Sequence, residues 1–356
     1  MNKRRINSLI KKIELIKLDA FLISKPVNLY YLTSFQASHA HLIVSNKGII
    51  AVTDFIYAEA AAECLKDCRV ITAGSAEDRW KSLSEVLRKM RIGRMGFEAD
   101  YLNFADFKNI SNLLKHTKLV PCINLMEEIR QVKEKGEIAA IRKSIEITGK
   151  ALNLTGKQLG ANKTEREIAH YIKENCIRCG AEGLAFEPIV ATQPNASKPH
   201  YCPMQKRLGK DSLILLDFGA LYKGYNSDLT RMRSIGKIKS RFKKIYSIIL
   251  EAQKRALDSI RPGVKISDLD SAARQHIEKK GFGKFFGHSL GHGIGLEIHE
   301  LPVVSGKNKN KLEQGMVFTV EPGVYIPGFG GMRIEDIALV KEKGCEVLTD
   351  DIDKSI

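Results

Sequence analysis

The spacing of apolar residues changes about one third of the way along the chain. Before that point, short apolar runs at residues 19–24, 48–54 and 94–100 predict strands, and helical periodicity is found at 58–65 and 81–90. This alternation predicts an α/β domain in which helices pack on a sheet. Because this part of the sequence carries no phosphate-binding loop, nucleophile elbow or cluster of metal-ligand residues, we expect a scaffold or a lid.

Pro121 and Cys122 mark the expected boundary between a domain of residues 1–122 and a domain of residues 123–356. Beyond this boundary, four segments have apolar residues at helical spacing: 138–152, 164–179, 245–256 and 267–281. The second of them opens with Thr164 and Glu167, which have the spacing of a capping box. Strand-like stretches lie between and after these helices, so we expect the second domain to be α+β.

The composition changes this picture little. At 44% hydrophobic and 28% charged residues, the chain resembles ordinary globular proteins, which excludes disorder throughout. The 57 Lys and Arg against 41 Asp and Glu give a net charge of +16. The basic residues are spread along the chain and do not alternate with aromatics, so we expect a solvated lysine-rich surface rather than a nucleic-acid interface.

The sequence also predicts a cytoplasmic protein. Four charged residues between positions 11 and 17 break the N-terminal apolar run, and no run approaches the roughly 20 residues that span a bilayer. Seven cysteines fit reduced thiols better than a disulfide framework. Cys176 and Cys179 form a single C-x-x-C inside a helical pattern, which favours packing on a helix face over zinc binding.

An acidic residue, Asp217, interrupts the apolar run 213–220. An ionised carboxylate in such a run costs on the order of several kcal/mol unless it is paired or bound to a cation. Asp228 lies on the expected return strand, after a two-residue turn at Lys223 and Gly224. Such a turn pairs odd with even positions, so both carboxylates are expected on one face of the hairpin. For this hairpin alone, the alternative is a structural salt bridge to Arg231 or Arg233.

A second hairpin-like run carries Glu321 and Glu335. Both positions are odd, so a common face requires a loop of odd length or a bulge, which the intervening glycines and prolines allow. Two hairpins would then direct four carboxylates into one pocket. Their mutual repulsion is best relieved by bound divalent metal.

Three histidines lie between the two hairpins, at His288, His292 and His299. The glycines among them argue against a helix, so they are not a helical metal-binding pair, and no H-E-x-x-H motif is present. A glycine-rich loop lets the backbone approach a ligand while presenting imidazoles. Four carboxylates and one imidazole favour Mn²⁺, Co²⁺, Fe²⁺ or Zn²⁺, and their charge is balanced better by two ions than by one.

Together these residues resemble the aminopeptidase P/prolidase family of pita-bread metallopeptidases. The resemblance covers about residues 125–350 and is carried by LDFGA, SDLTR, HSLGHGIGLEIHE, VEPGVY and GMRIED. It implies an α+β fold with a C-terminal pita-bread (creatinase/aminopeptidase-like) catalytic domain. A smaller α/β domain of the creatinase N-terminal type would precede it.

The resemblance implies a role for each metal ligand. Asp217 would bind one ion, His292 and Glu321 would bind the other, and Asp228 and Glu335 would bridge the two. The expected cofactor is two divalent ions per subunit, with Mn²⁺ first and Co²⁺, Zn²⁺ or Fe²⁺ as alternatives.

The resemblance also implies substrate-binding residues. His200 would bind substrate, His288 and His299 would contact the substrate and the tetrahedral intermediate, and Arg333 would support the ligand shell. The segment TQPNASKPH departs from the family, which usually has a Ser-Gly pair ahead of an Asn. This departure leaves the fine specificity of the pocket open.

The resemblance implies hydrolysis of N-terminal Xaa-Pro bonds, for which the expected nucleophile is a hydroxide that bridges the metals. Glu321 would carry the proton to the leaving nitrogen, and His288 and His299 would donate to the developing oxyanion. The expected partners are short peptides with proline at the second position and a second copy of the chain in a homodimer, without a membrane or nucleic acid. Dipeptidase and aminopeptidase action stay open.

Two other functions fit parts of the pattern. Methionine aminopeptidases resemble this catalytic domain and have the same five metal ligands. The long N-terminal domain and the GMRIED segment argue against that function. An inactive pita-bread module that binds proteins or nucleic acid would suit the +16 charge. Such a module is expected to have lost metal ligands, whereas all five are present here.

Overall fold

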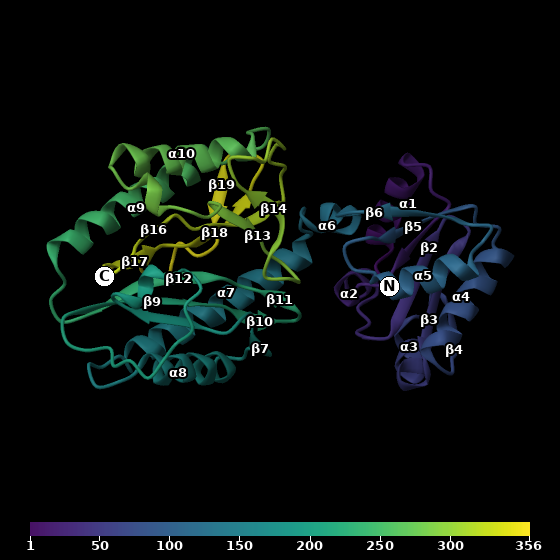
Figure 1. The fold of residues 1–356 in the computed structure, drawn as a ribbon, viewed down its shortest axis with the longest axis horizontal. Helices are drawn as coiled ribbons and strands as arrows, with labels where there is room; N and C mark the ends of the chain where they lie inside the picture. The colour runs from purple at the N-terminus through teal and green to yellow at the C-terminus, as the bar shows by residue number, and fades with distance from the viewer. The chain divides into compact units, whose positions relative to one another are not determined.

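The computed structural model describes residues 1–356 except the side chain of Ala76, and it divides into two compact units, Met1–Ile129 and Arg130–Ile356. The units meet at the last residue of helix α6 (Leu125–Arg130), whereas the sequence places the boundary after residue 122 (Figure 1). Each unit is described by itself.

Unit 1 contains a six-stranded mixed sheet in the order β4-β3-β2-β1-β5-β6. Its strands are β1 (Ala20–Ile23), β2 (Ala40–Ser45), β3 (Gly48–Asp54), β4 (Arg69–Ala73), β5 (Arg94–Glu98) and β6 (Lys118–Cys122). Its helices are α1 (Lys3–Leu15), α2 (Pro26–Thr33), α3 (Ala58–Cys64), α4 (Ala76–Lys89) and α5 (Phe104–Leu113).

Helices cover this sheet because the strands alternate apolar side chains between its faces. Ala20 and Leu22 of β1 share a core with Trp80 and Leu83 of α4, whereas the intervening Phe21 is buried on the other face. The predicted strands at 19–24, 48–54 and 94–100 are found as β1, β3 and β5. The predicted helices at 58–65 and 81–90 are found as α3 and α4, so the α/β prediction is confirmed.

Unit 2 contains four longer helices: α7 (Lys135–Gly156), α8 (Glu165–Arg178), α9 (Ser240–Ser259) and α10 (Ile266–Lys279). They correspond to the four predicted helical segments. α8 has the expected capping box, in which Thr164 and Glu167 each bond the other's backbone N–H. Cys176 is buried on α8, and Cys179 caps its C-terminus.

The strands of unit 2 form three small sheets and one larger sheet, in the orders β12-β9-β8, β11-β10-β7, β16-β17 and β14-β13-β15-β18-β19. Those in the first half are β7 (Gly183–Leu184), β8 (Ile189–Thr192), β9 (Ser212–Phe218), β10 (Ala220–Tyr222), β11 (Tyr225–Asn226) and β12 (Leu229–Ile235). Those in the second half are β13 (Gly291–Gly293), β14 (Glu300–Val304), β15 (Val317–Val320), β16 (Gly323–Ile326), β17 (Gly330–Arg333), β18 (Asp336–Val340) and β19 (Cys345–Val347).

Strand β9 is covered on both faces, which explains its continuous apolar run. Leu213 and Leu215 pack in the core that includes α9 and α10, whereas Ile214 and Leu216 pack in the core that includes α7 and α8. Figure 1 shows α9 and α10 on one side of the strands of this unit and α8 on the other. Asp217 has the parity of Leu213 and Leu215, so it faces the inner side, between the two halves of the unit.

The chain therefore has the expected fold, an α+β pita-bread domain preceded by a smaller α/β domain. Among the described residues, no helix is long and apolar enough to cross a membrane.

Candidate metal centre and substrate pocket

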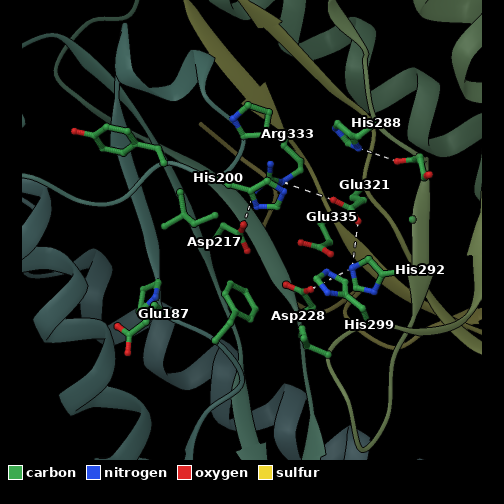
Figure 2. A pocket seen from close by; sticks show the side chains of 18 of the residues that line it. Glu187, His200, Asp217, Asp228, His288, His292, His299, Glu321, Arg333 and Glu335 are labelled. Atoms are coloured by element: carbon green, nitrogen blue, oxygen red, sulfur yellow. Dashed lines mark hydrogen bonds and ion pairs between the residues drawn. The ribbon is translucent and has the colours of Figure 1, made fainter. Parts of the chain in front are cut away.

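A cavity of about 610 Å³ opens between the two halves of unit 2 (Figure 2). Its lining includes all nine residues that the sequence singles out: His200, Asp217, Asp228, His288, His292, His299, Glu321, Arg333 and Glu335. The volume lies in the range of small-molecule sites. Residues far apart in the sequence thus share one concave site.

The first pair of carboxylates comes from the expected hairpin. Tyr222 pairs with Tyr225, which leaves a two-residue turn between β10 and β11. In the same register, Asp217 of β9 pairs with Thr230 of β12. Asp228 precedes Thr230 by two positions, so it lies on the same face as Asp217, and the side chains of both are nearly fully buried.

The second pair of carboxylates, Glu321 and Glu335, is brought together by two consecutive antiparallel β-ladders that share one register. Val320 of β15 pairs with Asp336 of β18, and Gly323 of β16 pairs with Arg333 of β17. This register places Glu321 opposite Glu335. The β16–β17 loop runs from residue 327 to 329, so it has the odd length that a common face requires.

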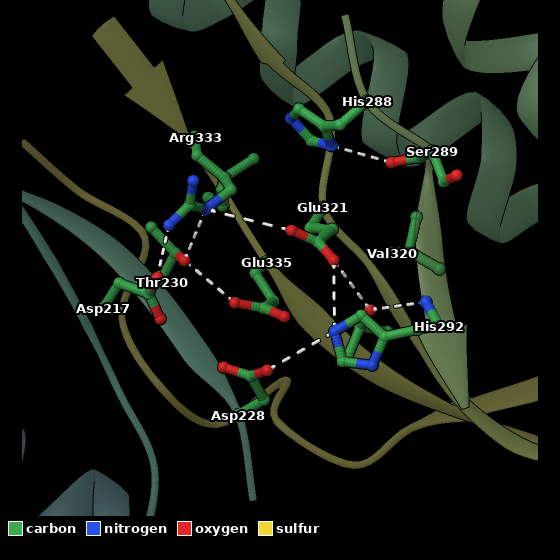
Figure 3. Close-up of polar contacts among 12 residues, drawn as sticks. Asp217, Asp228, Thr230, His288, Ser289, His292, Val320, Glu321, Arg333 and Glu335 are labelled. Carbon is green, nitrogen blue, oxygen red and sulfur yellow. Dashed lines mark hydrogen bonds and ion pairs between the residues drawn. The ribbon is translucent and has the colours of Figure 1, made fainter. Parts of the chain in front are cut away.

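His292 faces these carboxylates from β13 (Figure 3). Its Nε2 atom lies 3.6 Å from Oδ2 of Asp228 and 3.4 Å from Oε1 of Glu321. Its Nδ1 atom lies 3.0 Å from the carbonyl oxygen of Gly293, and because a carbonyl only accepts, Nδ1 carries the proton. The lone pair of Nε2 is therefore directed at the carboxylates, the arrangement typical of a metal-binding histidine.

Two carboxylate oxygens of the cluster lack a hydrogen-bond partner among the described residues. Among the described residues, Oδ1 of Asp217 and Oε1 of Glu335 are buried without a hydrogen-bond donor. Ligand atoms of Asp228, His292 and Glu335 all lie within 4.8 Å of one another. Buried acceptors without donors, grouped around a neutral imidazole, fit a divalent cation.

The electrostatics of the cluster support the same conclusion. Burial, reinforced by neighbouring carboxylates, raises the pKa of Asp228 and of Glu335 well above the usual range. Burial also raises the pKa of Glu321 to about 7 and lowers the pKa of His292 to about 4. Metal ions would favour the ionised carboxylates and the neutral imidazole, which binding requires.

Arg333 fixes one side of the cluster. Its Nε donates to Oγ1 of Thr230 at 2.9 Å, Nη1 donates to the hydroxyl of Tyr325 at 2.8 Å, and Nη2 donates to Asp217. Thr230 in turn donates to Oε2 of Glu335 at 2.8 Å. All three nitrogens of the guanidinium are therefore committed to neighbours, and two of the carboxylates are oriented by them.

The remaining histidines differ in their surroundings. His288 is half-buried, with Nδ1 2.7 Å from the carbonyl of Ser289 and Nε2 3.1 Å from the hydroxyl of Tyr325. His299 is exposed, and its ring meets that of His292 edge-on at 4.3 Å. His200 is also exposed and lies beside Asp217 (Figure 2). His299 and His200 thus face the cavity, whereas both nitrogens of His288 have protein partners.

Two supporting residues were not predicted from the sequence. Tyr325 stands in an apolar run, where nothing distinguishes it from a core residue. Glu165 stands at the first position of α8, where it fits a helix N-terminus. In the structure Glu165 is fully buried and accepts from Thr192, Asn195 and the hydroxyl of Tyr201, so it organises the pocket wall around His200.

Comparison with known proteins gives the family. The profile of "Metallopeptidase family M24" matches residues 139–342, and that of the "Creatinase/Prolidase N-terminal domain" matches residues 5–132. The chain belongs to metallopeptidase family M24, whose members use divalent metal ions.

Several individual proteins are similar over the full length. A Xaa-Pro dipeptidase of Pyrococcus furiosus is 35% identical over 349 residues, which cover 98% of each chain. The solved structure of a Xaa-Pro dipeptidase from Bacillus anthracis aligns with a TM-score of 0.95 at 32% identity, covering 99% of this chain and 98% of the other. That of an X-Pro aminopeptidase from Thermotoga maritima aligns with a TM-score of 0.89 at 38% identity, covering 97% and 99%.

Proposed function

We propose that the protein hydrolyses the bond before proline at the second position of peptides, as a Xaa-Pro exopeptidase of the aminopeptidase P/prolidase type. The observation that carries this proposal is the convergence of four carboxylates, three of them buried, and the Nε2 atom of His292 in one cavity. The names of relatives that match over the full length support the same reaction.

Five side chains would hold the metal: Asp217, Asp228, His292, Glu321 and Glu335. Two divalent ions, with Mn²⁺ first and Co²⁺, Zn²⁺ or Fe²⁺ as alternatives, balance the four carboxylates. Bound there, the ions supply a nucleophilic water at neutral pH and polarise the scissile carbonyl.

The side chains of the protein supply proton transfer and orientation. Glu321, a carboxylate at the metal centre, is placed to accept a proton and pass it to the leaving nitrogen. His299 and His200, which face the cavity, would bind the substrate and donate to the developing oxyanion. His288 would do so only after exchanging its hydrogen bond with Tyr325 for one with the substrate. The protonated amine of a peptide is attracted to the acidic cluster, which favours exopeptidase action.

A direct assay tests this function. We expect the Mn²⁺-, Co²⁺- or Zn²⁺-loaded protein to release alanine from Ala-Pro peptides and to leave Met-Ala peptides largely intact. Preferential cleavage of Met-Ala peptides would instead favour a methionine aminopeptidase. Metal analysis at neutral pH addresses the inactive-module alternative, because an empty site would support it.

Two finer expectations accompany the proposal. A homodimer rests on the resemblance to the family, and light scattering tests it. A cytoplasmic location is supported by the seven cysteines, all of which are free thiols in the structure.

A further inference from the structure

One edge of strand β17 is covered by a side chain instead of a strand. In the described part of the chain, β17 pairs only with β16, so its other edge has no strand neighbour. The side-chain amide of Gln193 takes that place. Its Nε2 donates to the carbonyl of Gly331 at 2.9 Å, and its Oε1 accepts from the N–H of Gly331 at 3.0 Å. One side chain therefore satisfies both backbone groups of Gly331.

The backbone that follows Gln193 also packs closely on this edge. A Cβ atom on Gly330 would overlap with Oε1 of Gln193, and a Cβ atom on Gly331 would overlap with the carbonyl oxygen of Ala196. Glycine at both positions of β17 permits this approach. Ala196 is itself buried in the core of unit 2. The start of the segment 193–201 is therefore fixed to β17.

The same segment carries His200 into the cavity. Asn195 donates to the hydroxyl of Tyr201 at 2.9 Å, which closes the segment into a compact loop. Asn195 and Tyr201 both donate to the buried carboxylate of Glu165. His200 directly precedes Tyr201, and its ring is exposed in the cavity (Figure 2). A displacement of the loop at Gln193 is therefore transmitted to His200.

Strand β17 leads to the metal cluster. Arg333 lies two positions after Gly331, and its guanidinium donates to Asp217 and to Thr230. Gln193 thus joins the segment of His200 to the strand of Arg333, and so it sets the spacing between the cavity wall and the cluster. Gln193 itself is not among the described residues that line the cavity, so it acts through a neighbour and not by touching a substrate.

This contact depends on the side chain that is particular to this sequence. The segment departs here from the family, which usually has a Ser-Gly pair ahead of the Asn. Neither Ser nor Gly carries a side-chain amide, so such a pair could not make the two hydrogen bonds of Gln193. The link to β17 is therefore a feature of this chain.

We propose that Gln193 is a positioning residue, which holds His200 at the distance from the metal centre at which it binds the substrate. The inference rests on the proposed Xaa-Pro hydrolysis and on the proposed role of His200 in it. Neither hydrogen bond of Gln193 involves a metal ligand. Loss of these bonds should therefore weaken substrate binding more than the chemical step.

Gln193→Met tests this directly, because methionine has a side chain of similar length without the amide. We expect KM for Ala-Pro peptides to rise about five- to tenfold, with kcat changed less than about twofold and the bound metal unchanged. Gln158→Met is the matched control. It removes the hydrogen bond of a glutamine to Asn175 away from the described lining of the cavity, and it should leave KM unchanged.

A double-mutant cycle with His200→Ala identifies the route of the effect. If Gln193 acts through His200, Gln193→Met should raise KM much less in the His200→Ala background than in the wild-type protein. A role in stability alone does not predict this dependence. Equal factors in the two backgrounds would show that Gln193 acts independently of His200, which overturns the proposal.

Hydrogen–deuterium exchange of residues 328–334 tests the contact without activity. The amide of Gly331 loses its acceptor in Gln193→Met and should exchange faster, whereas Gln158→Met should leave it as in the wild-type protein. Unchanged exchange in Gln193→Met would overturn the contact on which the inference depends.

The outcomes separate this inference from the proposed function. An unchanged KM in Gln193→Met, or a fall in kcat and bound metal without a change in KM, overturns the positioning role and leaves Xaa-Pro hydrolysis in place. If the metal-loaded wild-type protein hydrolyses no Ala-Pro peptide, the proposed function fails and the positioning role fails with it, whatever the exchange of Gly331 shows.

Discussion

Glu300 and Glu335 are both buried carboxylates of unit 2, yet their surroundings are opposite. Glu300 lies against Arg130 and accepts from Nζ of Lys133 at 2.9 Å. Although burial opposes ionisation, these two cations lower its pKa to about 2. Glu335 receives one hydrogen bond, from Thr230, and its other oxygen has no partner among the described residues. Burial and the neighbouring carboxylates raise its pKa instead.

This difference separates two uses of a buried carboxylate. The first is balanced by cations of the chain itself, and it ties the glycine-rich loop before Glu300 to the segment that begins unit 2. The second lies among other carboxylates with one oxygen that no donor meets, which fits a bound cation. Burial alone therefore does not indicate a functional carboxylate, whereas burial beside other carboxylates and a neutral imidazole, with an oxygen left unpaired, does so at Glu335.

The largest expected effect is the loss of a bridging ligand. Asp228→Ala and Glu335→Ala should each reduce hydrolysis of Xaa-Pro peptides to background and lower the bound metal, because the remaining donors no longer balance two ions. Elemental analysis and initial rates check this, with Glu342→Ala as the control. Full activity with metal still bound would remove the bridging assignment.

Removing the carboxylate of Glu300, which is paired with cations of the chain itself, should lower the stability of the fold. Glu300→Ala leaves Lys133 buried without the counter-charge of Glu300 and leaves Arg130 with Glu297, and we expect a loss of about 3–5 kcal/mol in the free energy of unfolding. Denaturant titration measures it. By contrast, Glu335→Gln in the metal-free protein replaces a carboxyl whose ionisation is already opposed by burial and neighbouring carboxylates, and it should not destabilise the fold. A loss below about 1 kcal/mol for Glu300→Ala would contradict the comparison.

The smallest expected effect is the dependence of stability on pH. Glu321 and Glu300 should contribute to it with opposite signs. The pKa of Glu321 is raised to about 7, above the value of about 4.3 in an unfolded chain, so this group contributes increasing stability to the metal-free protein as the pH falls from about 7.5 to 5. The pKa of Glu300 is lowered to about 2, so its contribution is present above about pH 4.3 and is lost below it.

Thermal unfolding against pH measures both effects. Because the lowered pKa of His292 acts in the opposite direction, the contribution of Glu321 is the difference in stability between the wild-type protein and Glu321→Gln, both metal-free. This difference should shift in favour of the wild-type protein as the pH falls from about 7.5 to 5. Saturating metal should remove the contribution of Glu321 on acidification, because binding requires ionised ligands. No change in the difference over this range would contradict the raised pKa of Glu321.

Local patterns in the sequence determined much of the fold. Periodicity and caps located α7 to α10 because these helices bury one apolar stripe each, and the capping box at Thr164 fixed where α8 begins. The shorter elements β2, α2 and β6 were not predicted. In α2, buried residues lie on most sides, so no helical stripe marks it.

The sequence also determined which side chains form the candidate site, because charged residues inside apolar runs and parity across hairpins are local properties. Only the tertiary structure decided how the two hairpins face each other, which oxygens lack donors, and that Tyr325 and Glu165 support the pocket. It also placed Glu187 in the cavity wall and committed the nitrogens of Arg333 to its neighbours. These properties depend on contacts between residues that are in some cases more than a hundred positions apart in the sequence. No local pattern encodes such contacts.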